Sequence, residues 1–262
     1  MHQADPAAKF LRFEQPLNER VRTLMRLEML FDQGDFGIQG EAEWHSRIAV
    51  ATLADILDIL ARGDLKSELI KELERVTGTL LPLMDKPGVD TDRLEYVIHQ
   101  CEDLLDRLRS HPGQLGIALR RDEFLAGVMQ RSGIAGGTCA FDLPAYHFWL
   151  QRSADHRRQD LEDWYAHLDS VRHAVRLILQ LIRDSAMPHS LTAHDGIFQR
   201  NLERGNSYQL VTVELPSDSP WFAEISGSKH FITIRFMEQG SSMERPAQTP
   251  RDVDFVLRCC AL

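Results

Sequence analysis

The sequence predicts an α+β fold, in which an N-terminal helical domain or bundle is followed by a small antiparallel β-domain. From residue 18 to residue 187, apolar residues recur mainly at helical spacing. After Pro188, β-branched and aromatic residues alternate with polar ones, and Gly, Asn, Ser and Pro separate the segments. We therefore assign residues 18–187 to the helical domain and 188–262 to the β-domain, which residues 9–17 could complete as an edge strand.

The helical domain divides at turn and breaker residues. Asn18 is a candidate N-cap for the first helix, and Gly34 follows its expected end. Gly63 and Pro188 mark later boundaries, because glycine weakens a helix and proline removes one of its hydrogen bonds. The expected helices are 18–31, 41–61, 65–80, 91–108, 121–131 and 156–184.

One segment inside the helical domain departs from this pattern. Residues 136–150, with the sequence GGTCAFDLPAYHFWL, begin with paired glycines, contain Pro144 and are rich in aromatic side chains. These features predict extended chain that packs between helices or joins the β-domain.

The C-terminal third carries strand signals. The expected strands are 208–215, 222–226, 230–237 and 253–259. The sequence SGSK at 226–229 predicts a hairpin turn. Strands joined by such short connections pair antiparallel, since parallel pairing requires a long crossover. The polar stretches 186–207 and 238–252 are expected to be mobile loops.

Composition limits the classes of partner. The chain has 262 residues, with 39 Asp and Glu against 30 Lys and Arg, and a net charge of −9. This balance argues against general nucleic-acid binding, which needs a broad excess of cations, but allows a local basic pocket for one acidic peptide. No apolar stretch approaches the roughly 20 residues of a membrane span, and the N-terminus has no signal-peptide pattern, so we expect a cytoplasmic protein.

Catalytic and metal-binding motifs are not evident in the sequence. There is no Gly-rich phosphate loop, nucleophile elbow or zinc-protease helix, and the 11 histidines are scattered. The four cysteines lack metal-ligand spacing and are expected to be reduced thiols. We therefore expect no enzyme activity, no cofactor and no metal.

Several specific segments occur in a fixed order along the chain. They are FEQPLNERVRTLMRLE, ARGDLKSELIKELER, PGVD, LRRDEF, FDLPAYHFWL and ISGSKHFITIRFM, between about residue 12 and residue 260. In this combination the chain resembles the ZapD family of bacterial division proteins over nearly its whole length. The pairing of FDLP with H-x-W-L is especially specific.

The resemblance implies a non-enzymatic protein of the cytoplasm, located at the division site. Members of the family are homodimers that bind the C-terminal tail of the tubulin-like division protein FtsZ. They thereby cross-link and bundle FtsZ filaments and stabilise the Z ring at midcell. Their fold is similar to the one predicted above, with basic residues lining the binding surface.

The resemblance also implies a basic pocket for the FtsZ tail. Its members here are Arg22, Arg26, Arg62, Arg120, Arg121, His147, Lys229, His230 and Arg235. Two positions depart from the family pattern, because Glu123 stands where a cation is expected and His230 stands where an arginine is expected. Arg22 and Arg26 share a helix face, and the planar fork of arginine suits a carboxylate. Arg20 is expected to be solvated.

An alternative function remains open at this point. A small-molecule enzyme or regulator could have its site between the helical and β-domains near His147. It predicts a deep, closed cavity with a perturbed histidine, whereas tail binding predicts an open basic surface.

Overall fold

The computed structural model describes residues 10–228 and 230–262. The chain divides into two compact units, which we describe separately. The helical unit is Thr23–Ile178, and the β unit combines the described residues up to Arg22 with Leu179–Leu262. The helices precede an antiparallel set of strands, which confirms the predicted α+β class.

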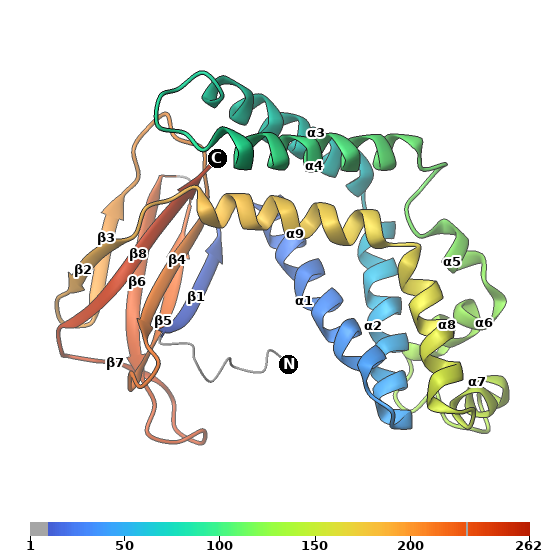
Figure 1. Ribbon diagram of the computed structural model, residues 1–262. Coiled ribbons are helices and arrows are strands. Elements are labelled where there is room, and N and C mark those ends of the chain that lie inside the picture. Colours follow the sequence, from blue (N-terminus) through green and yellow to red (C-terminus); the bar gives the residue numbers. More distant parts are fainter. Residues whose placement is uncertain (1–9, 229) are drawn as a thin grey trace. The chain divides into compact units, whose positions relative to one another are not determined.

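The helical elements are α1 (Glu19–Gln39), α2 (Glu43–Ala61), α3 (Leu65–Leu80), a 3-10 turn (Leu81–Leu83), α4 (Thr91–Ser110), α5 (Ile117–Arg121), α6 (Glu123–Ser132), α7 (Pro144–Leu150), α8 (Ala154–Ala166) and α9 (Asp169–Asp184) (Figure 1). Side-chain caps fix several of their starts. The predicted N-cap Asn18 accepts a hydrogen bond from the backbone N–H of Val21 at 2.8 Å. Asp64 and Asp122 cap α3 and α6 in the same way, which satisfies donors that have no partner inside the helix.

Helix α1 is longer than predicted, since it continues through Gly34 and Gly37 to Gln39. At both positions a larger side chain would overlap neighbouring atoms. A Cβ atom on Gly34 would lie 2.4 Å from the Tyr165 hydroxyl, and one on Gly37 would lie 2.8 Å from the backbone nitrogen of Ala49. These glycines are close-contact sites inside a helix, and interpreting Gly34 as a stop signal was wrong.

The segment 136–150 was also predicted incorrectly. It is not an extended segment, because Pro144–Leu150 forms α7 with proline in its first turn, where the missing N–H costs nothing. The segment belongs to the helical unit. Likewise, the single helix expected over 156–184 is interrupted at His167 and Leu168, and the fully buried Leu168 separates α8 from α9.

The β unit contains two antiparallel sheets. Its strands are β1 (Phe10–Pro16), β2 (His189–Ala193), β3 (Ile197–Asn201), β4 (Tyr208–Pro216), β5 (Trp221–Gly227), β6 (Phe231–Glu238), β7 (Ala247–Gln248) and β8 (Val253–Ala261). One sheet has the order β1-β4-β8-β2, and the other has the order β3-β6-β5 with β7 paired to β6 (Figure 1). The N-terminal segment thus supplies an edge strand by pairing with β4.

The core of the β unit is built from alternate residues of both sheets. Val211, Val213 and Leu215 of β4 are fully buried, as are Ile232, Ile234 and Phe236 of β6. These residues belong to one apolar cluster, so the two sheets pack as a sandwich. The strands β5 and β6, on either side of the hairpin turn predicted at 226–229, pair antiparallel, and Lys229 of that turn lies outside the described residues.

The stretch 186–207, expected to be a loop, instead contains β2 and β3. A two-residue turn at Asp195 and Gly196 connects them, with φ values of 50° and 68°. Positive φ at both positions is the geometry that an Asp-Gly hairpin favours. Asp252 holds this turn, since its carboxylate accepts hydrogen bonds from the Asp195 N–H and the His194 ring. The second expected loop, 238–252, includes the short strand β7.

Candidate functional site

The cations at the start of α1 have different environments. Arg20 is half-buried rather than solvated, and its guanidinium donates a hydrogen bond to the side chain of the buried Gln209 at 3.3 Å. Arg22 pairs with Glu19 at 3.1 Å. Arg26, one turn further along, is exposed and forms no ion pair with the described carboxylates. Arg26 therefore has the most accessible positive charge of the three.

A second group of cations lies at the C-terminal end of α2. Arg62 is its C-cap residue and is exposed. Arg120, from α5, donates to the Leu57 carbonyl at 3.0 Å and to the Asp58 carboxylate at 3.2 Å. The next residue, Arg121, is exposed. Positive side chains at this end also interact favourably with the helix dipole of α2.

His147 lies near the opposite end of α2. It is on the exposed face of α7, whose C-cap residue Gln151 donates a hydrogen bond to Glu43, the first residue of α2. Fourteen residues of helix separate Glu43 from Leu57, the residue that Arg120 contacts, which corresponds to about 21 Å. The structure brings Arg62 and Arg120 together, and it places His147 well away from them.

The remaining predicted residues belong to the β unit. Lys229 lies outside the described residues. His230 is exposed immediately before β6, with its N–H donating to the Ser228 hydroxyl. Arg235 is exposed on β6, directly opposite Glu224 of β5 in the strand register. It projects from the outer face of its sheet, since its neighbours Ile234 and Phe236 face the core.

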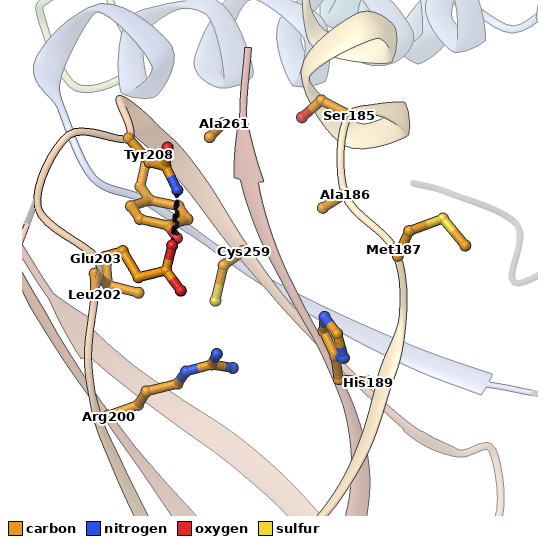
Figure 2. A pocket seen from close by; sticks show the side chains of 11 residues that line it. Ser185, Ala186, Met187, His189, Arg200, Leu202, Glu203, Tyr208, Cys259 and Ala261 are labelled. Carbon is orange, nitrogen blue, oxygen red and sulfur yellow. Dashed lines mark hydrogen bonds between the residues drawn. The ribbon is translucent and has the colours of Figure 1, made fainter. Parts of the chain in front are cut away.

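Sequence analysis missed a cavity of about 470 Å³ in the β unit (Figure 2). Its lining includes His189 from β2, Arg200 from β3, Tyr208 from β4 and Cys259 from β8. The missing signal was the Asp-Gly turn, which would have identified β2 and β3 on either side of it. Without those two strands, His189 and Arg200 could not be placed on a common sandwich.

Two kinds of feature are absent from the described part of the chain. No helix there is long and apolar enough to span a bilayer. Nor does any group of three or more His, Cys, Asp or Glu side chains there have the arrangement needed to hold a metal ion.

Comparison with known proteins places these observations in a family. The sequence profile of ZapD, described as a cell division protein, matches residues 25–235. The chain belongs to the ZapD family. Over 250 residues it is 45% identical to the cell division protein ZapD of Methylococcus capsulatus, covering 95% of this chain and 98% of that protein. It is 40% identical over 249 residues to the cell division protein ZapD of Cupriavidus metallidurans, with 95% and 98% covered. Family membership assigns the chain to cell division and septation.

Proposed function

We propose that this protein binds the acidic C-terminal tail of FtsZ and, as a homodimer, cross-links FtsZ filaments at the midcell Z ring. The observation that carries the proposal is a set of exposed cations without carboxylate partners among the described residues, on a chain of the ZapD family whose net charge is −9. Binding and cross-linking require no catalytic step, so we propose a non-enzymatic protein.

The ion pairs divide the predicted cations into two classes. Arg22 and Arg120 already contact the carboxylates of Glu19 and Asp58. Arg26 and Arg121 are exposed without such partners in the described chain. To bind Arg22 or Arg120, a carboxylate of the tail would have to displace the carboxylate of Glu19 or Asp58. It can bind Arg26 and Arg121 without displacing another group. We therefore assign the larger share of tail binding to Arg26 and Arg121.

An extended ligand suits the distance between Arg120 and His147 on the helical unit. Arg120 contacts α2 at Leu57, and the end of α7, the helix that carries His147, contacts α2 at Glu43. These two points on α2 are about 21 Å apart. About seven residues of extended peptide cover that distance. A tail lying along α2 could therefore contact both ends of the helix, whereas a compact small molecule could not.

The alternative of a small-molecule site near His147 receives less support. His147 is exposed and lines neither the β-unit cavity nor a second cavity of about 450 Å³ near Gly63 and Gly113. A histidine that acts on a small molecule is expected in an enclosed pocket.

Titration of a labelled FtsZ tail peptide tests the binding step. We expect Arg26→Ala and Arg121→Ala each to weaken binding by about ten- to a hundredfold, because each removes a charge-assisted hydrogen bond worth about 1.5–3 kcal/mol. Arg22→Ala should have a smaller effect. The matched control is Arg93→Ala, which removes an exposed arginine from the first turns of α4. Equal affinities for the Arg26, Arg121 and Arg93 variants would reject the assigned residues.

A further inference from the structure

The β-unit cavity lies where the core of the sandwich ends, and the strand register places three of its lining residues, His189, Arg200 and Cys259, on the core-facing side of their strands. On β8, Leu257 is fully buried in the core, so Cys259, two residues later, faces the same side. On β2, Leu191 packs against the core cluster, and His189 lies two residues before it. These side chains continue the interior face beyond the last apolar layer.

The opposite wall is formed by β3 and the chain that follows it. Phe198 packs against the core cluster, so Arg200 projects from the same face of β3 toward the cavity. Figure 2 shows Arg200, His189 and the Cys259 thiol directed toward the same space. Arg200 is exposed at the edge of this cavity and has no ion pair among the described residues, so its guanidinium is accessible to a carboxylate that enters the cavity.

The only lining carboxylate drawn in the cavity, Glu203, has other partners. It accepts a hydrogen bond from the side-chain amide of Asn206 at 3.3 Å, and the same amide donates to the Tyr208 hydroxyl at 3.2 Å. This arrangement holds Glu203 at one side of the cavity, more than ion-pairing distance from Arg200. The cavity thus carries one positive and one negative charge that do not neutralise each other directly, with His189 as a second potential cation.

We propose that this cavity binds a small organic monocarboxylate, with its carboxylate between Arg200 and His189 and its apolar part against Leu202 and Met187. The volume of about 470 Å³ lies in the range of small-molecule sites. Arginine and histidine together supply several N–H donors for one carboxylate. Glu203 repels additional negative charge, which selects against phosphates and dicarboxylates. This site is distinct from the cations assigned to the FtsZ tail.

The test uses benzoate and hexanoate as ligands, with benzamide as the neutral analogue of benzoate and inorganic phosphate as a small polyanion. Binding is followed by chemical shifts of the full-length protein. We expect saturable shifts in residues around the cavity with both carboxylates, and at least tenfold weaker binding of benzamide and phosphate. Equal binding of benzoate and benzamide, or no saturable shift with either carboxylate, would refute the proposal.

Variants separate a binding role from a structural one. Arg200→Gln should weaken benzoate binding at least tenfold, whereas the control Arg235→Gln, on the outer face of the same sheet, should not. Glu203→Gln should strengthen benzoate binding severalfold and allow phosphate to bind, an effect that loss of structure would not produce. If Glu203→Gln weakens benzoate binding, or if the two arginine variants behave alike, the proposed carboxylate position is wrong.

A second readout uses the thiol within the cavity. Cys259 is half-buried, and Cys139 is the exposed cysteine of the described chain. In a Cys139→Ser background, saturating benzoate should slow alkylation of Cys259 several-fold, because the ligand would cover the sulfur. An unchanged alkylation rate at a concentration that saturates the chemical shifts would place the ligand elsewhere.

Discussion

At the scale of single residues, one buried charge of the helical unit, Arg157, is not among the proposed binding cations. Arg157 is only 6% exposed. Its guanidinium donates to the Ser46 hydroxyl at 2.9 Å and to the backbone carbonyls of Glu41, Leu150 and Arg152. No described carboxylate pairs with it. A buried arginine that binds carbonyls joins the α1–α2 turn, the end of α7 and α8 into one structure.

Replacement of Arg157 by lysine tests this role. Lysine keeps the charge but lacks the planar fork, so it leaves buried carbonyls without donors. We expect the free energy of unfolding to fall by about 2–4 kcal/mol. Urea denaturation followed by tryptophan fluorescence gives the value. Arg158→Lys is the control, since Arg158 forms a largely exposed pair with Asp155 and should change stability by less than about 1 kcal/mol. Similar values for the two variants would contradict the assigned role.

At the scale of elements, α1 owes its close packing to glycine. Gly34→Ala should destabilise the protein by about 1–3 kcal/mol, because the added methyl group would overlap the buried Tyr165 ring. Gly78→Ala is the matched control inside α3, where no atom lies within 4 Å of the added carbon. It should stabilise the protein by about 0.5–1 kcal/mol. Thermal or urea unfolding distinguishes the two, and a stabilised Gly34→Ala variant would disprove the packing argument.

Buried tyrosines in α7 and α8 should make the stability of the protein depend on pH in the alkaline range. Burial raises the pKa of Tyr146 to about 12, and burial likewise raises the pKa of Tyr165. In the unfolded chain a tyrosine ionises near pH 10, so the stabilisation is complete below about pH 10. It is lost as the pH rises from there through the folded-state pKa of about 12. Stability measured by urea denaturation should fall over this interval, and Tyr146→Phe should make the decline shallower. A stability that did not change over this pH interval would contradict the prediction.

Sequence analysis identified some elements from local signals, misread one glycine whose role depends on a distant contact, and misread or overlooked two local signals. Asn18 was identified correctly as an N-cap because capping is a local interaction. Gly34 was misinterpreted because its reason, the Tyr165 ring, lies 131 residues away. Pro144 was read as a sign of extended chain, although proline also favours the first turn of a helix. The Asp-Gly turn at 195–196 was a local signal that was overlooked.

The candidate site shows the same division. Residue types and family resemblance supplied a set of nine side chains, but only the folded chain reveals which of them have partners. The ion pair of Arg120 with Asp58 joins residues 62 positions apart in the sequence, and no spacing rule predicts it. The inward orientation of Arg200 follows from the pairing of β3 with β6, which sequence analysis did not include.

At the scale of the whole molecule, the net charge of −9 shapes binding to an anionic partner. The proposed tail contacts are exposed, so salt should screen them. Raising the ionic strength from about 0.1 M to about 1 M shortens the Debye length from roughly 10 Å to roughly 3 Å. We expect tail affinity to fall over this range for the wild type and to fall less steeply for Arg26→Ala. The same slope for both proteins would show that Arg26 does not contact the tail.

Filament bundling tests the proposed dimer. Two linked sites on filaments that present many tails should raise the apparent affinity by about a hundredfold or more over a single site. Sedimentation of FtsZ with the protein should therefore show bundles only when the protein is dimeric, as established in parallel by analytical ultracentrifugation. Bundling by a variant shown to be monomeric would disprove the bivalent mechanism.

The position of β8 in the order β1-β4-β8-β2 has a consequence for biosynthesis. This strand is translated after the other three, yet it lies between two of them. Phe13 of β1 must wait for its partner Val213, about 200 residues later, which at typical elongation rates takes about 10–40 s. On the ribosome, the helices can therefore assemble while β1 still has no neighbour. A stop codon before residue 253 should release a chain with folded helices in which β2 and β4 lack their shared neighbour β8, so that the β unit is protease-sensitive.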